Sequence, residues 1–457
     1  MSVVLKFGGS SVADGACILR VAEIAKNSLR HSPVVVLSAM GKTTDALLAA
    51  AAKAEGGEGE GALSALENLI GTHLGACRDL WNGRIPQDLE RFISSAAAQL
   101  EMLLRGVCLL RELSPRSRDA IVAFGELLSS QIVASFLASL DVPTSWLDVR
   151  RVLRTGARFG AAEPLEPQIH DLVRTELVPL MGPGRVVVTQ GYIGATASGI
   201  TTTLGRGGSD YSASLLGAAL GASEVQIWTD VEGILTADPR IVPEASPISE
   251  LSFREAAELA AFGARVLHPA TIQPAVEANI PVTVRHTMRP DGRFSTITAK
   301  GASGSPRPAT AIASRGPINV ITIESTRMLA QSGFLARIFE VFGRLGASVD
   351  VVATAEVSVS LTVEATAPIE AIKKELGAFA HVSVAEGRAL VALVGERLKH
   401  TPGLAARVFG ALSSINVEMI SMGSNEINLS LVVERKDEAA AVRMLHKALF
   451  AGNGASK

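Results

Sequence analysis

The sequence predicts an α/β protein with a mainly parallel sheet, followed by a duplicated C-terminal module. Wholly apolar runs at 3–5, 34–37 and 186–188 are typical of buried strands, and segments with helical periodicity separate them. Such alternation favours a parallel sheet, in which ligands bind at the carboxyl ends of the strands. The last third of the chain contains an internal repeat that aligns Gly333 with Gly403.

The composition is that of a globular protein of several domains. The chain has 457 residues, of which 47% are hydrophobic and 19% charged. At roughly 100–200 residues per domain, this length predicts two to four domains. A net charge of −2 and an aromatic content of 4% argue against nucleic-acid binding, because phosphates and bases would find few partners.

Cysteine usage and the N-terminus predict a cytoplasmic protein. Cys17, Cys77 and Cys108 lie far apart without metal-ligand spacing, so neither a disulfide framework nor a zinc site is expected. The segment 1–6 is too short for a signal peptide. We find no uninterrupted apolar run of about 18 residues, which argues against a membrane span.

The first strand runs directly into a glycine turn at 6–12, and a helix is expected to follow through about Leu29. A strand, a glycine turn and a helix form a phosphate-binding arrangement, and Lys6 could reach the phosphates of a nucleotide. The alternative is that Lys6 is a solvated charge at a strand end. The nearby Gly41-Lys42-Thr43 is not a P-loop, because Val36 stands where that motif requires glycine.

A second glycine turn lies at 201–211 and carries a cation. Its glycines allow a close backbone approach to a ligand, and Arg206 suits a carboxylate or phosphate. Ser209 is expected to cap the helix at 212–220, whose amino end would then face the turn. The alternative is a tight turn before a packed helix.

Two further side chains are candidate ligand contacts. Thr44 follows the strand at 34–37, and its alternative role is a helix cap. Glu126 lies in the first turn of a helix between apolar neighbours. It either complements the helix dipole or is buried near a ligand amine. The strand at 225–230 ends in Thr and Asp, which suit ribose and phosphate contacts, and Ser252 with Glu255 predicts a capping box.

Together these segments resemble aspartokinase of the amino-acid kinase family, close to the monofunctional, lysine-sensitive type. The resemblance rests on KFGGSSV at 6–12, TTTLGRGGSDYSA at 201–213, WTDVEGI at 228–234, TADPR at 236–240 and FGARVLHPA at 262–270. It implies an αβα sandwich around a mainly parallel sheet. It also implies the reaction of ATP with L-aspartate to give ADP and 4-phospho-L-aspartate, with Mg²⁺, as the first step towards lysine, threonine and methionine.

The resemblance also implies roles for individual residues. Lys6 and Asp210 would be catalytic, and the substrate would contact Thr44, Glu126, Arg206 and Ser209. The nucleotide would contact Lys6, Gly8, Gly9, Ser10, Thr229, Asp230, Arg240 and Arg265. Two positions depart from the family pattern, because Ser10 stands where Thr is frequent and Arg265 where Lys is common. No protein ligand set for a metal is predicted.

The C-terminal repeat resembles a tandem of ACT domains of ferredoxin-like fold, which bind amino acids at paired interfaces. A linker-like run at 301–308 separates it from a catalytic domain at 1–300. We expect the first ACT domain at 316–385 and the second at 386–457, with a strand from about 309–315 added to the second. The alternative is a duplicated module that serves only dimerisation.

The resemblance further implies feedback inhibition, with lysine as the expected effector and threonine as the alternative. The proposed effector residues are Met328, Gln331, Gly333, Phe334, Leu335, Asp350 and Glu356. The carboxylates would hold ammonium groups, and the turn before the helix would offer backbone N–H groups to a carboxylate. The second repeat keeps Glu426 but has Ile420 at the position of Asp350, so it is expected to support the interface.

Partners are therefore expected to be small molecules and a second copy of the chain, in a homodimer or homotetramer. A rival function is an amino-acid sensor that keeps the fold without transferring phosphate. Another is a kinase for a different acid, such as N-acetylglutamate. Lys6, Arg206 and Asp210 disfavour the sensor, and the repeat disfavours the other kinase.

Overall fold

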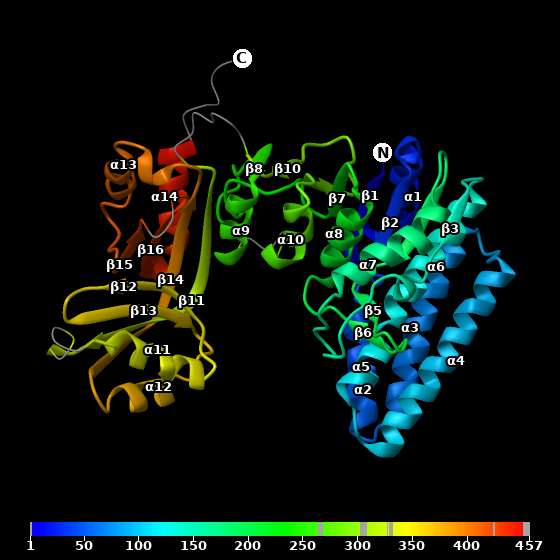
Figure 1. Ribbon diagram of the computed structural model, residues 1–457, viewed down its shortest axis with the longest axis horizontal. Coiled ribbons are helices and arrows are strands. Elements are labelled where there is room, and N and C mark those ends of the chain that lie inside the picture. The colour runs from blue at the N-terminus through cyan, green and yellow to red at the C-terminus, as the bar shows by residue number, and fades with distance from the viewer. Residues whose placement is uncertain are drawn as a thin grey trace, which may run out of the picture. The chain divides into compact units, whose positions relative to one another are not determined.

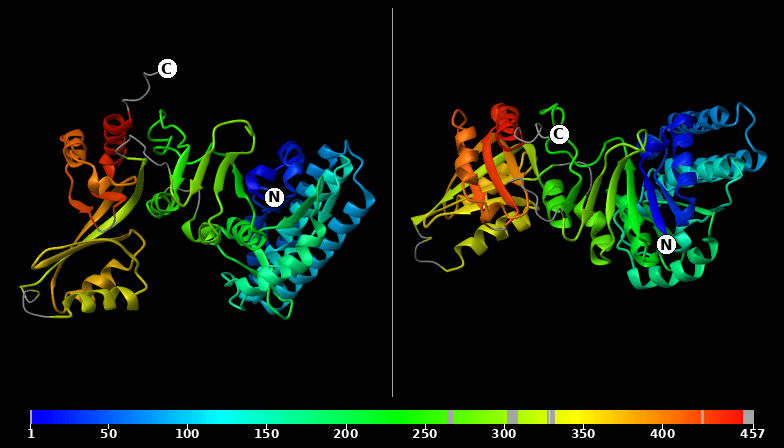
Figure 2. Two further views of the ribbon diagram at one scale, coloured as in Figure 1. Left: turned by 45° about the horizontal axis from the view of Figure 1, so that its top comes forward. Right: turned by 90° about the horizontal axis from the view of Figure 1, so that it is seen from above.

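The computed structural model divides into two compact units, shown in Figure 1 and from two further directions in Figure 2. It describes residues 2–263, 268–301, 309–326, 328, 332–423 and 426–450. The first unit comprises Met1–Ile234 and Val266–Gly301, and the second comprises Leu235–Arg265 and Ala302–Lys457. The segment Leu235–Arg265 therefore belongs to the second unit, although parts of the first unit precede and follow it in the chain.

The first unit is built on a mainly parallel sheet. Its strands in this unit follow the order β3-β4-β2-β1-β7-β9-β10. All neighbours are parallel except β9 and β10, which are antiparallel. The strands are β1 (Val3–Phe7), β2 (Pro33–Leu37), β3 (Thr144–Trp146), β4 (Val186–Gln190), β7 (Glu224–Thr229), β9 (Val282–His286) and β10 (Ser295–Thr298).

Helices cover both faces of this sheet, which confirms the predicted αβα sandwich. Leu5 and Phe7 of β1 belong to the core beneath one helical layer. Val4 points the other way and lies against Gly217 of α8. The first layer contains α1 (Gly15–Asn27), α3 (Gly59–Leu80), α4 (Gln87–Leu110) and α6 (Phe124–Ser139), and the second contains α7 (Glu166–Leu172), α8 (Gly208–Leu220) and α10 (Pro269–Glu277). Because both faces are covered, β1, β2 and β4 are buried along their whole length.

Shorter elements complete the first unit near the carboxyl ends of the strands. Helices α2 (Thr43–Glu55) and α5 (Pro115–Val122) pack against each other. The antiparallel pair β5 (Ile193–Ala195) and β6 (Thr201–Thr203) packs beside α5. The remaining short turns of helix are Gly9–Val12, Leu29–His31, Val149–Arg151, Val173–Leu177 and Val178–Leu180.

Two helical stretches are long and apolar enough to cross a membrane by length and composition alone. They are Gln87–Leu110 and Pro115–Ser139, and 28% and 78% of their most apolar 18-residue windows are buried inside the structure. The second stretch is therefore packed like the core helix of a globular protein. The first, α4, buries one face that includes Leu89, Ile93 and Leu100. Other apolar side chains of α4, including Met102, Leu109 and Leu110, are exposed.

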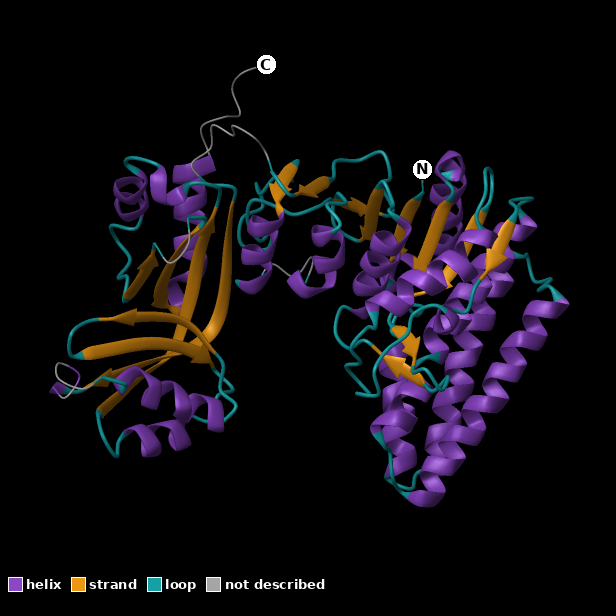
Figure 3. Ribbon diagram, in the orientation of Figure 1, coloured by secondary structure: helices purple, strands orange, loops and turns teal. Residues whose placement is uncertain are grey.

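The second unit contains a six-stranded antiparallel sheet with the order β12-β13-β11-β14-β16-β15. Figure 3 shows these strands with their helices. The strands are β11 (Ala311–Glu324), β12 (Val349–Thr354), β13 (Ser358–Glu364), β14 (His381–Val394), β15 (Met419–Met422) and β16 (Asn428–Glu434). The helices are α11 (Phe334–Arg344), α12 (Ile369–Leu376), α13 (Leu404–Ala411) and α14 (Glu438–Phe450).

The two long strands β11 and β14 serve both halves of this sheet. The residues Ile318–Glu324 of β11 pair with β13, whereas Ala311–Arg315 pair only with the end of β14 that also pairs with β16. Each half has its own core, one beneath α11 and α12 and one beneath α13 and α14. The ferredoxin-like C-terminal halves predicted from the repeat are thus present, and Ala311–Arg315 of β11 lie in the half that contains β16.

The segment 235–265 of the second unit contains β8 (Glu250–Ser252) and α9 (Phe253–Ala261), and α9 packs against β11 and β14. The predicted capping box between Ser252 and Glu255 is confirmed at the start of α9. The buried Glu255 carboxylate also accepts hydrogen bonds from the Thr310 hydroxyl at 2.5 Å and from the Glu396 backbone N–H at 3.1 Å. One side chain therefore joins three separate segments of this unit.

One expected helix is present with an end two residues earlier than predicted, and one expected helix cap is wrong. The helix after the first glycine turn begins at Gly15, where Asp14 accepts a hydrogen bond from the Cys17 backbone N–H, and it ends at Asn27. Ser209 does not cap α8, because that helix begins at Gly208 and its N-cap is Gly207 with φ of +72°. A glycine adopts this conformation without the strain that serine would suffer there.

Candidate active site

Backbone hydrogen bonds join the chain at the carboxyl ends of β1, β2, β4 and β7. The Gly8 N–H donates to the Trp228 carbonyl at 3.2 Å, and the Gly41 N–H donates to the Gly9 carbonyl at 3.0 Å. The Gly191 N–H donates to the carbonyl of Leu37 at 2.8 Å. The two sequence motifs after β1 and β2 therefore form one continuous wall at this edge of the sheet.

A cleft of about 530 Å³ lies at this edge. It brings together Lys6, Gly9, Thr44, Glu126, Arg206, Ser209 and Asp210 of the predicted site. Its other lining residues are Ser38, Ala39, Gly41, Lys42, Asp45, Arg118, Gly160, Tyr192, Gly205, Gly207 and Gly208. The position agrees with the rule that parallel sheets bind ligands at the carboxyl ends of their strands.

Lys6 is a buried cation paired with Asp210. The residue is 8% exposed, and its Nζ lies 2.6 Å from Oδ1 of Asp210 in the first turn of α8. A buried charge requires such a partner, because desolvation without one is costly. The pair holds the ammonium group of Lys6 at the cleft wall, which excludes the solvated strand-end interpretation.

The turn that carries Arg206 owes its shape to glycines. Gly205 and Gly207 have φ of +78° and +72°, and Arg206 between them is exposed towards the cleft. A Cβ on Gly208 would lie 2.7 Å from the Tyr192 ring, and one on Gly191 would lie 2.7 Å from the Cβ of Ser209. The turn is therefore packed against the loop after β4 at distances that only glycine permits.

Glu126 is buried at the base of the cleft with half of its carboxyl unpartnered. The residue is 3% exposed, and Oε1 accepts a hydrogen bond from the Ala39 backbone N–H at 3.2 Å. Among the residues that the structure describes, Oε2 finds no partner. Burial raises the pKa of this carboxyl to about 8, against the smaller lowering effect of the Ala39 hydrogen bond. Such a group is suited to a cationic ligand that enters the cleft.

The other predicted contacts occupy different places. Thr44 is the second residue of α2 and lines the cleft, so it is not the cap of that helix, whose N-cap is Lys42. Gly8, Ser10, Thr229 and Asp230 do not line the cleft and lie at the carboxyl ends of β1 and β7. Arg240 lies in the second unit and pairs with Asp238 at 2.5 Å, and Arg265 lies outside the described residues.

The predicted effector residues do not gather in one place within the chain. Gly333 is the N-cap of α11, with Phe334 and Leu335 in its first turn. The Ser325 N–H donates to the Val357 carbonyl and the Met328 N–H to the Ser325 carbonyl, which brings Met328 near Glu356. Gln331 lies outside the described residues.

Asp350 is the member that stands apart. It is the second residue of β12, whereas Glu356 lies beyond the last residue of that strand. At about 3.3 Å per residue, an extended strand separates the two carboxylates widely. Asp350 Oδ2 instead lies 2.5 Å from a guanidinium nitrogen of Arg315. The two carboxylates therefore lie at different points of β12 and the turn after it, and Asp350 already has a partner in Arg315.

Sequence reasoning missed several cleft residues, notably Arg118 and Tyr192. Tyr192 follows β4 and could have been found from the rule on strand ends, since Gly191 precedes it. Arg118 lies inside α5, without a glycine turn or a strand end beside it. No local pattern marks it, because only packing between distant segments brings α5 to the cleft.

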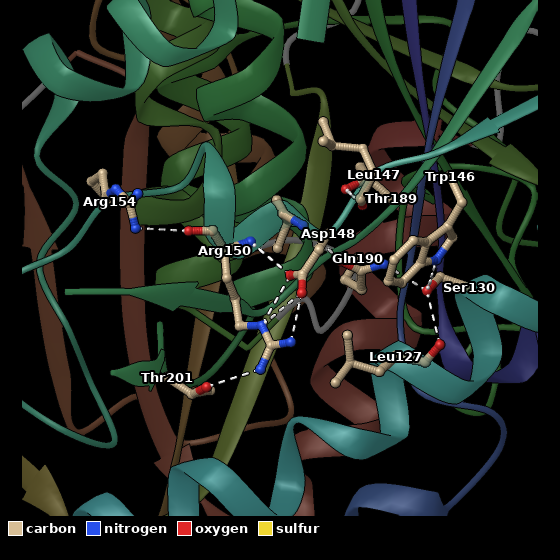
Figure 4. A network of polar contacts seen from close by, with 11 residues as sticks. Leu127, Ser130, Trp146, Leu147, Asp148, Arg150, Arg154, Thr189, Gln190 and Thr201 are labelled. Carbon is tan, nitrogen blue, oxygen red and sulfur yellow. Dashed lines mark hydrogen bonds and ion pairs between the residues drawn. The ribbon is translucent and has the colours of Figure 1, made fainter. Parts of the chain in front are cut away.

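A polar network links α6 to β3, to β4 and to the turn that begins at Val149 (Figure 4). The Ser130 hydroxyl of α6 accepts hydrogen bonds from Gln190 Nε2 at 2.7 Å and Trp146 Nε1 at 3.0 Å. The Gln190 side-chain oxygen accepts from the Val149 backbone N–H at 2.8 Å. These bonds tie the helix that carries Glu126 to the ends of β3 and β4.

The charges in the cleft suit an anionic ligand that also carries an amine. Lys6, Lys42, Arg118 and Arg206 supply positive charge, and Glu126 offers a buried carboxyl group. Within the described part of the chain, no cluster of three His, Cys, Asp or Glu residues forms a metal site. Mg²⁺ is nevertheless compatible with Asp45 and Asp210, because that ion is bound mainly by substrate phosphates, water and one or two carboxylates.

Comparison with known proteins identifies relatives along nearly the whole chain. The model of the amino acid kinase family matches residues 1–286, and a model of an ACT domain matches residues 391–449. The chain is 41% identical to the lysine-sensitive aspartokinase 3 of Escherichia coli (strain K12), covering 98% of this chain and 99% of that protein. It is 37% identical to aspartokinase 1, chloroplastic, of Arabidopsis thaliana, covering 98% and 80%.

Solved structures show the same likeness. E. coli aspartokinase III in complex with aspartate and ADP (R-state) has a TM-score of 0.82 at 40% identity, covering 98% of this chain and 100% of that one. The same enzyme in complex with lysine and aspartate (T-state) has a TM-score of 0.81 at 40% identity, covering 98% and 99%.

The loop after β1 approaches the loop after β2 so closely that a side chain at Gly9 should destabilise the protein. A Cβ on Gly9 would lie 2.8 Å from the Gly41 carbonyl oxygen and 2.9 Å from that of Ala39, and both are backbone atoms. We expect Gly9→Ala to force these loops apart and to lower the stability of the protein by roughly 1–3 kcal/mol, as overpacking does. Thermal unfolding of the purified variant measures this.

Gly75→Ala provides the matched control. Gly75 lies inside α3 with nothing within 4 Å of an added Cβ, so this change should raise stability by about 0.5–1 kcal/mol. Equal unfolding temperatures for the two variants would contradict the packing argument.

Proposed function

Because this chain belongs to the aspartokinases of the amino acid kinase family, we propose how its residues transfer the γ-phosphoryl group of ATP to L-aspartate. The β-carboxylate of aspartate is the acceptor, and the products are ADP and 4-phospho-L-aspartate. The observation that carries this proposal is the meeting of Lys6–Asp210, Arg206 and Glu126 in one cleft. Groups of the correct charge for a phosphate of ATP and for the carboxylate and ammonium groups of aspartate thus line one cleft, which supports the proposal.

The chemical step requires no general base. A side-chain carboxylate with a pKa near ~3.9 is already ionised at pH 7. Its oxygen attacks the γ-phosphorus as the bond from phosphorus to the β,γ-bridging oxygen breaks, and ADP leaves with that electron pair. Catalysis is then positioning and charge neutralisation, as is general for phosphoryl transfer.

The residues predicted from the sequence have the following places in this scheme. Lys6 contacts the phosphates, and Asp210 holds its ammonium group in position. Arg206 binds the α-carboxylate of aspartate, Glu126 binds its α-ammonium group, and Thr44 and Ser209 complete the substrate contacts. Gly8, Gly9, Ser10, Thr229, Asp230, Arg240 and Arg265 are assigned to the nucleotide side. Mg²⁺ bound to ATP would neutralise the phosphates.

The second unit is proposed to sense an amino acid and to form a dimer. In this proposal residues 1–300 form the catalytic domain, and two ACT domains follow at 316–385 and 386–457. Exposed apolar side chains in the first half of this unit support contact with a second copy, namely Leu335 and Phe339 on α11 and Val357 between β12 and β13. Lysine is the proposed effector, since a relative named lysine-sensitive is 41% identical along nearly its whole length.

We further propose a cytoplasmic enzyme that catalyses the first step of the pathway to lysine, threonine and methionine. Cys17, Cys77 and Cys108 are all free thiols, which suits a reducing compartment.

The role of Lys6 predicts a large loss of turnover. We expect Lys6→Ala to lower kcat at least ~100-fold, as the loss of one preorganised electrostatic group does. Steady-state rates of aspartyl phosphate formation, trapped as the hydroxamate, measure this. Lys26→Ala is the matched control, because Lys26 is an exposed lysine on α1 that does not line the cleft, and it should leave kcat unchanged. Normal turnover of Lys6→Ala would overturn the assigned role.

The buried Glu126 predicts a pH dependence of aspartate binding. With its pKa raised to about 8, the carboxyl is mostly protonated at pH 7 in the free enzyme. Binding of an ammonium group requires the carboxylate, so a proton must leave. We expect the KM for aspartate to fall as pH rises towards 8, by at most about tenfold per pH unit, and then to level off.

The KM for ATP, measured over the same pH range, is the internal control. In Glu126→Gln the KM for aspartate should be high and independent of pH, because the amide cannot ionise. A parent enzyme whose KM for aspartate stays constant from pH 6.5 to 8.5 would show that Glu126 does not bind the amine.

If lysine binds at the first repeat, substitutions at equivalent positions of the two repeats should differ in their effect on inhibition by lysine. We expect Glu356→Gln to raise the lysine concentration for half-inhibition at least about tenfold, equivalent to about 1.4 kcal/mol of lost coupling. Asp350→Asn should also raise it, but less, because Arg315 already occupies that carboxylate. Glu426→Gln, at the matching position of the second repeat, should leave it unchanged.

Rates with lysine, threonine and methionine test the effector, and a parent enzyme insensitive to all three would refute the regulatory proposal.

A further inference from the structure

Asp119 is a buried carboxyl group that the proposed chemistry leaves without a role. It lies in α5 and is 1% exposed. Its Oδ2 accepts hydrogen bonds from the backbone N–H groups of Gly160 and Thr203, both at 2.9 Å. Its Oδ1 accepts a third bond from the Thr203 hydroxyl, also at 2.9 Å. Three donors from two distant segments therefore converge on one side chain.

Both of these segments form walls of the cleft. Gly160 lines the cleft itself. Thr203 is the last residue of β6 and directly precedes the turn that carries Arg206. Arg118, the neighbour of Asp119 in α5, lines the same cleft. Asp119 thus sits behind the surface on which we place the α-carboxylate of the substrate.

The strand before the Arg206 turn is anchored residue by residue. Arg150 donates to the Thr201 hydroxyl at 3.1 Å, a contact visible in Figure 4. The Thr155 and Thr202 hydroxyls share a hydrogen bond of 2.7 Å. Asp119 supplies the third anchor, at Thr203. The next residue, Leu204, is also held, because its N–H donates to the Tyr192 carbonyl at 2.9 Å.

The turn itself requires such an anchor. Gly205 and Gly207 both adopt positive φ, and glycine has more conformational freedom to lose than any other residue. Arg206 between them is exposed, so packing of its own side chain does not fix its position. Its guanidinium can meet a carboxylate with the correct geometry only if the backbone before the turn is held.

We propose that Asp119 is a positioning residue for aspartate recognition, which holds the Gly160 loop and the Arg206 turn in register across the cleft. The proposal rests on the substrate role given to Arg206 above. Asp119 touches no substrate atom in this scheme. It acts through the backbone N–H groups and the hydroxyl that it binds.

The bonding pattern predicts which substitution Asp119 tolerates. Burial raises the pKa of this carboxyl, and the hydrogen bonds from Gly160 and Thr203 oppose that effect. An asparagine can direct its amide oxygen to the two N–H groups and its amide nitrogen to the Thr203 hydroxyl, which then accepts. Asp119→Asn therefore keeps all three contacts, whereas Asp119→Ala loses all of them and leaves two N–H groups unsatisfied.

The test is a comparison of KM values in the full-length enzyme. We expect Asp119→Ala to raise the KM for aspartate about tenfold or more, as a small misplacement of a binding group does, with the KM for ATP unchanged. Asp119→Asn should restore the KM for aspartate to within about threefold of the parent value. Thr203→Val, which removes only the hydroxyl contact, should fall between them and serves if Asp119→Ala does not fold.

Ser114→Ala is the matched control. The Ser114 hydroxyl caps α5 by accepting a hydrogen bond from the Ser117 N–H at 3.1 Å, so its loss weakens the same helix without touching the cleft. It should lower the unfolding temperature but leave both KM values unchanged. The proposal is overturned if Asp119→Ala keeps a normal KM for aspartate, if both KM values rise together, or if Ser114→Ala reproduces the effect. A parent enzyme without aspartate-dependent activity would instead refute the proposed function.

Discussion

The ion pair between Lys6 and Asp210 is the contact on which the cleft depends. An ammonium group that is almost wholly removed from water must have a partner, and Asp210 in the first turn of α8 is that partner at 2.6 Å. The pair joins the end of β1 to the start of α8. It therefore fixes the first glycine turn relative to the turn that carries Arg206. Lys6 remains at the cleft wall, where a phosphate can reach it.

Two buried carboxyl groups of the first unit, Asp119 and Glu126, differ in the number of hydrogen bonds that they accept. Asp119 accepts three hydrogen bonds, so its bonding capacity is used within the protein. Glu126 accepts one bond from Ala39 and has an oxygen with no partner among the described residues. Burial raises the pKa of both, but only Glu126 has capacity left for a ligand. Environment, and not residue type, thus distinguishes the carboxyl group with a full set of hydrogen bonds from the one with a free oxygen.

The second unit shows how a duplicated sequence can form one continuous structure. Because β11 and β14 extend through both halves, the two repeats share one sheet. The same two strands therefore contribute backbone to both halves. The segment 235–265 is bound to the same sheet region through Glu255, Thr310 and Glu396. The ion pair between Arg315 and Asp350 lies where β11 passes from one half to the other. The second unit therefore contains both the proposed effector region and the segment 235–265, which lies between two parts of the first unit in the sequence.

The sequence by itself determined the elements whose signals are local. The apolar strands, the glycine turns with Lys6 and Arg206, the capping box at Ser252 and the repeat were all predicted, because periodicity and turn chemistry report on adjacent residues. Only the tertiary structure decided that Arg118 reaches the cleft, that α8 begins at Gly208 and that Asp350 lies apart from Glu356. These features depend on how segments far apart in the chain pack together. Burial, pairing and pKa are properties of that packing, and a linear pattern does not contain them.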